Sequence, residues 1–518
     1  MRIATVLFGL LLAAGLLPCR ADPLPLAATV GPWRWAAQPV IHAGRVWFAS
    51  ANRWPDHNSA DIWSIGADGS GARPERRLFS QDTGRPAVFD GLLWWPLEDP
   101  RASLGWGEVA VTDGRTWRTL QTRTGRQYHL HSVSGSDGGL LLAGSERSAL
   151  VLSSIDGGVT WRSVFAQPWQ EGRFSRTYAA HDLGHGIAGD LYRFGDGRES
   201  GDVARLTASG AVPVTGWPDG APVARLVRTG RSVTGIVIRQ DGVREIWRTD
   251  LKTVTALPPL PEGLAVDLAV DGDRLHALAA TEPGGRVWRL DGDGWTPVAE
   301  VPAGEVLDLA VAGGRPVVAG GLDGKGALWM APLDLPAVGA GAPPLPAQYG
   351  NLPVDRDAAL QALRGLMADR ASYRNHGEGL RDGIDQLLVA GLPGTALADL
   401  LDGPFPEGDV SLVGGRNMAS YRRFGRWIIL NAMRVRGAGQ VPPALIALPF
   451  DEAPSASEKY FGEAVAAIVA AGAIGQDDPD TVAALRAQAA AEDNPDWLRA
   501  DAREALRRIT GRRGGERD

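Results

Sequence analysis

Residues 154–164 read SIDGGVTWRSV and follow directly after the apolar run ALVL at 149–152. The apolar run has the length and composition of a buried strand, and the glycine-rich stretch after it has those of a tight turn. Ser154 and Asp156 offer oxygen atoms that accept hydrogen bonds from turn amides, and the two glycines after Asp156 tolerate a positive φ. The stretch therefore predicts a turn between two strands, in which Asp156 has a structural and not a catalytic role.

A short strand-like pattern recurs along the chain on both sides of this turn. Of the 18 tryptophans, 16 lie before residue 335, and Trp247, Trp288 and Trp329 are spaced 41 residues apart. Similar segments occur earlier, as ADIWSIG (60–66), GEVAVTD (107–113), SALVLSS (148–154) and GDVARLT (201–207). Pairs of short apolar runs joined by a Gly/Asp turn recur with the same period, which is the pattern of β-hairpins. A period of about 41–47 residues predicts the four-stranded blades of a β-propeller, and we count seven.

The opening stretch resembles the Asp-box, S-x-D-x-G-x-T-W, of sialidase-like and BNR-repeat propellers. The matching residues are Ser154, Asp156, Gly158, Thr160 and Trp161, and AVTDGRTW (110–117) is a degraded copy. In that family the motif is the turn between the two outer strands of a blade, so the resemblance implies a structural role in which Trp161 packs between blades. The resemblance implies a propeller but no sialidase activity, because the Arg-Ile-Pro signature of true sialidases is absent from the sequence.

The chain changes character after residue 335. The stretch PAVGAGAPPLPAQYGNLP (336–353) has no periodicity and predicts a linker. Apolar residues at helical spacing follow in DRDAALQALRGLMADR (355–370), NMASYRRFGRWIILNAMRVRG (417–437), EKYFGEAVAAIVAAGAI (458–474) and DTVAALRAQAAAED (480–493). We expect Asn494 to cap the last helix, Pro495 to begin it and Gly511 to end it. The last two helices resemble a HEAT-type repeat.

The first residues have the features of an export signal. Arg2 precedes the apolar run VLFGLLLAAGLL (6–17), which is too short to span a bilayer and is followed by small residues. A signal peptide cleaved after Ala21 is therefore expected, with a buried N-terminal element as the alternative. A lipid anchor on Cys19 is disfavoured because Pro18 precedes it. Since Cys19 is the only cysteine, the mature protein would form no disulfide.

The expected organisation is a multidomain chain with an all-β propeller followed by an all-α domain. Its parts are a signal peptide at 1–21, a seven-bladed propeller at 30–337, a linker at 338–353, a HEAT-like helical domain at 354–512 and a tail at 513–518. The expected location is the periplasm or the cell exterior, and no transmembrane segment is expected.

Charge and motifs exclude several function classes. A net charge of −7 gives the whole chain no electrostatic footprint for nucleic acid. The sequence contains no HExxH, no phosphate-binding loop, no nucleophile elbow and no cysteine pair, so neither a cofactor nor a metal centre is expected. A metal site built from His129, His131, His181 and His185 is a disfavoured alternative, because single histidines at strand ends are ordinary.

One position of the repeat is polar in five consecutive copies. Aligning the first strand of each repeat gives Pro39, Pro86, His131, Tyr178, Arg225, Asp267 and Asp308. First strands of propellers line the central channel, so the five polar side chains are expected to converge on one rim. They are the candidate binding residues for a polar or anionic carbohydrate-like ligand. The alternative is a channel paired internally, with Arg225 bound to Asp267.

These patterns favour an exported, non-catalytic binding or scaffold protein that uses the channel rim and the helical domain as recognition surfaces, with a protein or a carbohydrate-like ligand as partner. The alternative is a glycan-active, sialidase-like hydrolase acting at the rim, for which no catalytic residue can be named. A run of arginines in the helical part is predicted to be a solvated face rather than an anion-binding surface. These arginines are Arg416, Arg422, Arg423, Arg426, Arg434 and Arg436.

Overall fold

The computed structural model describes residues 21–511 except 32, 52–59, 102, 125–128, 146–147, 169–172, 196–197, 336–342, 351, 413–416 and 451–461. The expected signal peptide, apart from Ala21, and the expected tail lie outside the described residues. In the described part of the chain, no helix is both long enough and apolar enough to cross a membrane.

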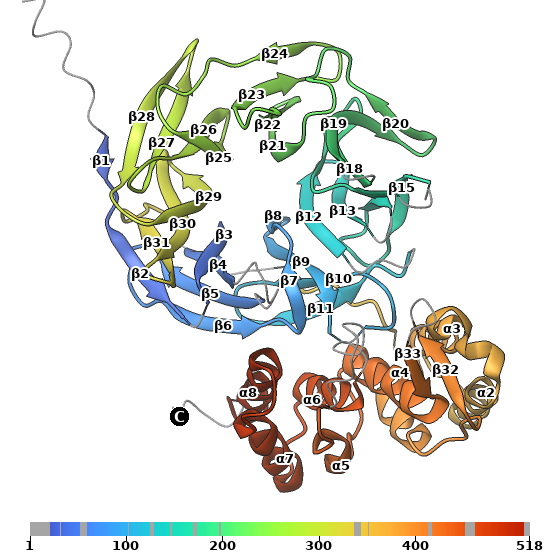
Figure 1. Ribbon diagram of the computed structural model, residues 1–518. Coiled ribbons are helices and arrows are strands. Elements are labelled where there is room, and N and C mark those ends of the chain that lie inside the picture. Colours follow the sequence, from blue (N-terminus) through green and yellow to red (C-terminus); the bar gives the residue numbers. More distant parts are fainter. Residues whose placement is uncertain are drawn as a thin grey trace, which may run out of the picture.

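Sheets whose neighbouring strands are mostly antiparallel form a ring (Figure 1), and three of its six sheets contain four strands. The first sheet consists of β3 (Trp35–His42), β4 (Arg45–Ala51), β5 (Asp61–Gly66) and β6 (Arg73–Arg77). A nine-stranded sheet follows, with β7 (Ser80–Thr83), β8 (Ala87–Phe89), β9 (Leu92–Pro100), β10 (Glu108–Thr112), β11 (Trp117–Gln121), β12 (His129–Ser136), β13 (Gly139–Ser145), β14 (Ala149–Ser154) and β15 (Arg162–Ala166). This arrangement is a β-propeller.

The ring continues with four further sheets. They contain β16 (Phe174–Arg176), β17 (Ala180–Asp182), β18 (Ile187–Gly195), β19 (Arg198–Thr207) and β20 (Gly210–Pro213), then β21 (Val223–Thr229), β22 (Ser232–Ile238), β23 (Arg244–Thr249) and β24 (Val254–Ala256). After these come β25 (Leu264–Asp271), β26 (Arg274–Ala280), β27 (Gly285–Asp291) and β28 (Gly294–Val301), then β29 (Glu305–Ala312), β30 (Arg315–Leu322) and β31 (Lys325–Met330). The repeated tryptophans Trp247, Trp288 and Trp329 lie on strands, as the pattern predicts, and the structure shows that these strands, β23, β27 and β31, are the third of their repeats.

Two N-terminal strands complete the last sheets of the ring. The strand β2 (Leu26–Val30) is antiparallel to β31 and supplies the outer strand that the last sheet lacks. The shorter β1 (Asp22–Pro23) pairs in parallel with β28. The ring is therefore closed by strands from its two ends in the sequence.

The helical part contains α2 (Arg356–Ala368), η1 (Arg370–Tyr373), α3 (Arg374–Ala390), η2 (Gly394–Leu400), α4 (Tyr421–Arg436), α5 (Pro443–Ile446), α6 (Glu463–Ile474), α7 (Pro479–Ala490) and α8 (Asp496–Thr510). A two-stranded sheet of β32 (Asp409–Leu412) and β33 (Asn417–Ser420) interrupts it, so this part is not all-α as expected. The predicted cap of α8 is also wrong. Pro495 is the N-cap residue, because the Asn494 side chain is used to donate to the Gln488 side chain at 2.7 Å.

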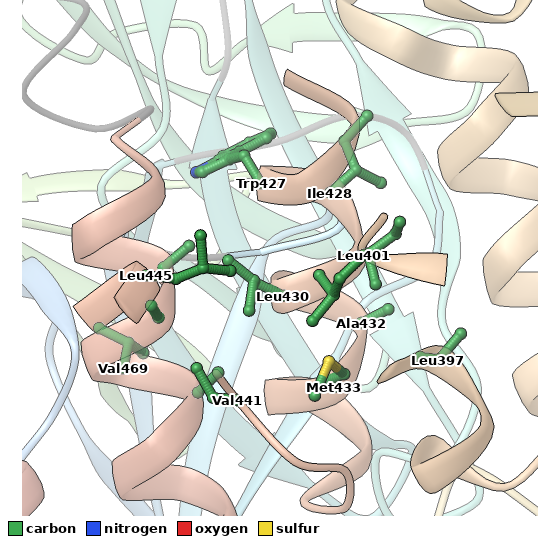
Figure 2. Close-up of a cluster of buried hydrophobic side chains, with 14 of the residues drawn as sticks. Leu397, Leu401, Trp427, Ile428, Leu430, Ala432, Met433, Val441, Leu445 and Val469 are labelled. Atoms are coloured by element: carbon green, nitrogen blue, oxygen red, sulfur yellow. The ribbon is translucent and has the colours of Figure 1, made fainter. Parts of the chain in front are cut away.

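The core of the helical part is built around α4, which is buried on most of its surface. Figure 2 shows its side chains between Leu397 and Leu401 of the η2 region and Leu445 and Val469 of α5 and α6. The helix α6 is apolar on all sides and is buried accordingly. The same cluster of buried residues includes Phe79 and Leu104 of the propeller, so apolar packing continues from one part into the other.

The helices lie outside the ring beside β6 and β11 (Figure 1), and buried ion pairs join the two parts. Asp501 of α8 accepts from the Arg77 Nε at 2.6 Å, and its second oxygen lies 3.4 Å from the Arg101 Nε. Arg434 of α4 donates to Glu108 of β10, whose burial raises the pKa of that carboxyl. Removing one partner of such a pair leaves a buried charge uncompensated, so each pair fixes the relative placement of the two parts.

The described end of the predicted linker is held against the ring. The Gln348 side chain accepts a hydrogen bond from the Gln121 N at 2.6 Å, and Arg118 donates to the Leu345 carbonyl at 3.1 Å. The Tyr349 hydroxyl bonds Asp385 of α3 at 3.1 Å, and Asp385 also forms an ion pair of 2.9 Å with Arg123. Residues 343–350 therefore bridge the propeller and the helices rather than separating them.

Candidate functional site

Three of the five predicted channel residues come together in one ion-pair cluster. The Arg225 Nε lies 2.9 Å from Asp267 Oδ1. Arg85 spans both aspartates, with its Nη2 at 2.6 Å from Asp308 Oδ1 and 3.2 Å from Asp267 Oδ1. The sequence alignment missed Arg85 because it selected the next residue, Pro86, at that position of the repeat. We call these four residues, Arg85, Arg225, Asp267 and Asp308, the Arg–Asp cluster.

The two carboxylates of the Arg–Asp cluster are fully engaged in structural contacts. Asp267 Oδ2 accepts the backbone N–H of Leu309 on the next sheet at 2.8 Å. Asp308 Oδ2 accepts the backbone N–H of Gln38 on β3 at 3.0 Å. Both side chains are buried, with relative exposures of 0% and 1%. Each aspartate therefore fastens its own sheet to the next one around the ring.

Burial and the neighbouring charges shift the pKa values of the two arginines of the cluster in opposite directions. Burial opposes the charge on Arg85, but the attraction of Asp267 and Asp308 raises its pKa. Burial and the neighbouring Arg85 lower the pKa of Arg225 to about 10, against the attraction of Asp267, so Arg225 also stays charged at neutral pH. The arrangement is an internally paired channel wall, which was the alternative that the sequence left open.

The first strands that carry the predicted channel residues share an irregularity in their pairing register. The pairing register shifts between Val223 and Arg225 on β21, between Ala265 and Asp267 on β25, and between Val306 and Asp308 on β29. The shift between Leu130 and Ser132 on β12 leaves His131 as the extra residue. A β-bulge turns side chains away from simple alternation, so it explains how the repeat presents one polar residue per strand to the centre.

The other two predicted residues, His131 and Tyr178, form a second group. Their ring centroids are 4.6 Å apart. Burial lowers the pKa of His131, and Glu98 lies 3.7 Å from its Nδ1. Burial also opposes the charge on His129, but Glu98 and Asp99 raise its pKa. The second group thus contains two neighbouring histidines whose pKa values are shifted in opposite directions, that of His131 down and that of His129 up.

Asp190 links the two groups and was missed by the sequence analysis. Its Oδ1 accepts the backbone N–H groups of Tyr178 and Ala179 at 2.8 and 2.9 Å. Burial raises the pKa of Asp190 to about 7, and the charge of Arg225 acts against this. Asp190 lies on β18, a second strand of its repeat, where the first-strand alignment could not find it.

Aromatic rings extend from His131 outward along β16 and β18. Tyr178 lies 5.9 Å from Tyr192, Tyr192 lies 5.6 Å from Phe194, and Phe194 stacks on Phe174 at 5.7 Å. The register pairs Phe174 with Phe194 directly across the two strands. We call this row the aromatic strip, and it comprises His129, His131, Tyr178, Tyr192, Phe194 and Phe174.

Two rings of the aromatic strip, Phe174 and Tyr178, are exposed, whereas His131 is buried. Phe174 is 47% exposed and Tyr178 is 39% exposed. Polar groups flank the rings, since the Arg176 guanidinium lies 5.3 Å from the Phe194 ring and the Tyr192 hydroxyl donates to Glu199. Exposed aromatic faces beside charged hydrogen-bonding groups suit a ligand that has both apolar faces and hydroxyl groups.

The side chains of the turn at 154–161 form hydrogen bonds with one another and with the backbone of the turn. The Ser154 hydroxyl donates to Asp156 Oδ1 at 2.8 Å, and Thr160 donates to Asp156 through its N–H at 2.9 Å and its hydroxyl at 2.6 Å. Gly158 has a φ of 82°, and a Cβ there would lie 2.7 Å from the Trp94 ring. Trp161 is buried in the same cluster as Trp94, which belongs to the neighbouring repeat. The structural role of this turn remains a prediction.

The four histidines proposed as an alternative metal site are not gathered at one point. His129 and His131 stack at 6.1 Å, whereas His181 contacts the Leu226 carbonyl at 3.2 Å and His185 the Asp250 carbonyl at 2.8 Å. Within the residues that the structure describes, no group of three or more His, Cys, Asp or Glu side chains is placed to hold a metal ion.

Comparison with known proteins gives distant structural likenesses. No protein-family model matches the chain. No curated protein matches it either. A puromycin-hydrolysing peptidase of Mycobacterium tuberculosis is 15% identical with a TM-score of 0.39, and the match covers 58% of this chain and 52% of the peptidase. This chain thus spans about half the length of that peptidase.

Two solved β-propeller domains give similar values. The Cps50 (Swd1) domain of Myceliophteria thermophila is 14% identical with a TM-score of 0.40, and the match covers 58% of this chain and 98% of the domain. The propeller domain of the trilobed protease of Pyrococcus furiosus is 10% identical with a TM-score of 0.36, and the match covers 57% and 96%. Values this low say nothing about activity, so the site must be interpreted from its own chemistry.

Proposed function

We propose that this protein is an exported, non-catalytic binding or scaffold protein that takes a carbohydrate-like ligand on its aromatic strip. The observation that carries the proposal is the exposure of Phe174 and Tyr178 within a continuous row of rings in contact. Aromatic faces of this kind cover the apolar face of a sugar ring, while Arg176 and Glu199 are near enough to engage its hydroxyl groups.

The scaffold in this proposal is a seven-bladed propeller with an Asp-box turn. The nine-stranded sheet is continuous only through β9, where His129 of β12 pairs with Glu98. Dividing the sheet at this pair gives two units that each end in an outer hairpin, β10–β11 and β14–β15. Together with the five other sheets of the ring, this division agrees with the seven repeats of the sequence. The propeller at 30–337 and the helical domain at 354–512 are proposed as separate recognition surfaces of one chain.

The hydrogen bonds that Asp267 and Asp308 already accept favour binding over catalysis. A glycosidase needs one carboxyl group that gives a proton and a second that acts as base or nucleophile. Asp267 and Asp308 already accept hydrogen bonds from Arg85 and from backbone N–H groups of neighbouring sheets. Their protonation would break the contacts that hold the ring together.

A glycan-active hydrolase remains the second candidate because of one residue. The Asp190 carboxyl adjoins Tyr178 of the aromatic strip, and burial raises its pKa to about 7. A group with this pKa exchanges protons readily at neutral pH, as general acid–base catalysis requires. No second carboxyl with a matching role is assigned beside it.

The proposal is tested by glycan-array binding of Phe174→Ala and Tyr178→Ala. Each variant should lose at least ten-fold in affinity for the glycans that the parent binds, because stacking area is removed, while its melting temperature changes little. Ile155→Ala is the control, since Ile155 is 74% exposed and lies outside the aromatic strip. A parent that binds no glycan, or strip variants that bind as the parent does, would refute the proposal.

A further inference from the structure

Three side chains of β16 and the residues directly after it lie on one side of the chain. Phe174 and Tyr178 are exposed and Arg176 is partly exposed, whereas Ser175 and Thr177 between them have relative exposures of only 8% and 0%. Successive side chains of an extended chain point to opposite sides, so this alternation puts the three exposed side chains on the same side. Arg176 therefore lies between the two exposed rings of the aromatic strip.

Two further rings also lie between these exposed rings. Phe174 contacts Phe194, Phe194 contacts Tyr192 and Tyr192 contacts Tyr178, with successive centroid distances of 5.7, 5.6 and 5.9 Å. Along β16, an advance of about 3.3 Å per residue separates the Cα atoms of Phe174 and Tyr178 by at most about 13 Å. Because a pyranose ring is about as wide as one aromatic ring, a single sugar covers only one of the two exposed rings.

The inner end of the aromatic strip lies against the channel wall. His131 is only 6% exposed, and its ring lies 4.6 Å from the Tyr178 ring. The His131 carbonyl accepts the backbone N–H of Arg85 from the Arg–Asp cluster at 2.8 Å. Phe174, at the other end, is 47% exposed. The strip is thus covered at its inner end and open at its outer end.

Charged hydrogen-bonding groups surround Tyr178 at the inner end. The side chains of Glu98 and His129 are 26% and 24% exposed, and the Glu98 Oε1 lies 3.5 Å from the His129 Nδ1. Burial raises the pKa of the Tyr178 hydroxyl, Arg176 opposes this rise and Glu98 adds to it, so both charged groups lie near the ring. A carboxylate accepts hydrogen bonds from sugar hydroxyl groups, and a guanidinium group donates to them.

The outer end offers mainly ring surface. Phe174 stacks on Phe194, and Glu199 lies opposite Phe194 in the register of β18 and β19. Glu199 already accepts a hydrogen bond from the Tyr192 hydroxyl. The two ends therefore differ, because a sugar on Tyr178 can be fixed by hydrogen bonds, whereas a sugar on Phe174 is held mostly by stacking.

We propose that the aromatic strip binds the end of a linear oligosaccharide longer than a disaccharide, with the terminal sugar on Tyr178 and the later sugars extending over Phe174. This inference rests on the proposed carbohydrate binding and adds the length and the direction of the ligand. Arg176 donates to hydroxyl groups of the sugars between the two exposed rings. A single sugar uses only the inner end of the strip.

The length is tested with the linear glycan that the parent binds best on the array, taken as its terminal mono-, di-, tri- and tetrasaccharide. Titration calorimetry should show an affinity that rises beyond the disaccharide by about ten-fold, as the contact with a second aromatic face provides. Phe174→Ala should bind the monosaccharide as the parent does and lose this rise. Tyr178→Ala should bind every length more weakly. Unchanged binding of the monosaccharide also shows that the Phe174→Ala variant is folded.

The direction is tested with two forms of the tetrasaccharide, each capped by a bulky group at one of its ends. One capped form should bind as the uncapped ligand does, and the other should not bind, because its end meets the channel wall. The control is Val212→Ala, since Val212 is 60% exposed and lies on β20, the outer strand of the same sheet. This variant should match the parent at every length.

Three results overturn the inference and leave carbohydrate binding in place. They are an affinity that is the same for every length, a Phe174→Ala variant that loses as much affinity for the monosaccharide as for the tetrasaccharide, and two capped forms that both bind like the uncapped ligand. A parent that binds no glycan at all instead refutes the proposed function, and this inference with it.

Discussion

The Arg–Asp cluster and the aromatic strip are neighbours in the same ring, since the Arg85 N donates to the His131 carbonyl at 2.8 Å, yet they differ in what they offer to a ligand. Asp267 and Asp308 are buried and their oxygen atoms are used within the ring. Tyr178 and Phe174 are partly exposed to solvent. Polar side chains that meet at a channel therefore do not by themselves define a binding site. The aspartates already have all their partners within the protein, whereas the exposed rings can still contact a ligand.

The largest expected effect is that of Asp267→Ala, which removes the carboxylate shared by Arg85 and Arg225. Two partly buried guanidinium groups then lose a partner, so the free energy of unfolding should fall by about 3–5 kcal/mol. Chemical denaturation measures the loss, and glycan binding by the fraction that remains folded should be unchanged. The matched control is Asp273→Ala in the exposed hairpin turn of the same sheet. An Asp267→Ala variant that is as stable as the parent but has lost glycan binding would show that the Arg–Asp cluster, and not the aromatic strip, binds the ligand.

A smaller effect is expected for Arg225→Ala, because Asp267 keeps Arg85 as a partner. The loss of the hydrogen bond from the charged Arg225 to the Leu268 carbonyl, and of its ion pair with Asp267, should lower the free energy of unfolding by about 1.5–3 kcal/mol. The thermal midpoint should fall, and the glycan-array profile should stay that of the parent. If the glycan-array profile changes while the thermal midpoint does not, Arg225 contacts the ligand and belongs to the binding region.

The last prediction is a pH dependence and concerns Asp190, whose carboxyl accepts the backbone N–H of Tyr178. Its pKa is about 7 in the folded protein, above the ordinary value of 3.8, because burial disfavours the charged form. Its contribution to stability is therefore complete below about pH 4 and is lost as the pH rises towards 7. The difference in unfolding free energy between the parent and Asp190→Asn should thus change over this window by about 3–4 kcal/mol.

Unfolding curves of both proteins at pH 4, 5.5 and 7 measure this change. If the difference is the same at every pH, Asp190 titrates normally and the observation in favour of a hydrolase disappears. If Asp190→Asn also abolishes turnover of a glycan that the parent cleaves, the second candidate function replaces the first.

Much of the ring follows from the sequence because each repeat encodes its own hairpins. The spacing of Trp247, Trp288 and Trp329 identified equivalent strands of successive repeats, since a side chain that fills the same gap in each repeat must recur with the period of the repeat. Arg85 could not be found in this way. It reaches the cluster from the segment between β7 and β8, where the repeat is irregular.

The two parts of the molecule also meet in a way that the sequence does not reveal. The sequence pattern places Arg434 on an exposed helix face, but the structure buries it. Glu108 of the propeller forms an ion pair with Arg434 and so compensates its buried charge. Similarly, the Pro/Gly/Ala composition of 336–353 predicts a linker but not that Gln348 would bond Gln121. Local patterns report local structure, whereas these contacts join residues hundreds of positions apart.

The closing strand β2 imposes an order of events on the synthesis of this protein. Leu26 pairs with Trp329, so a strand that leaves the ribosome among the first waits for a partner made almost at the end of the ring. Until then the outer edge of β31 has no native partner, and an open sheet edge pairs readily with other chains. Contacts between residues so distant in sequence also form slowly. The newly made protein is therefore most vulnerable to aggregation just before its first and last propeller strands meet.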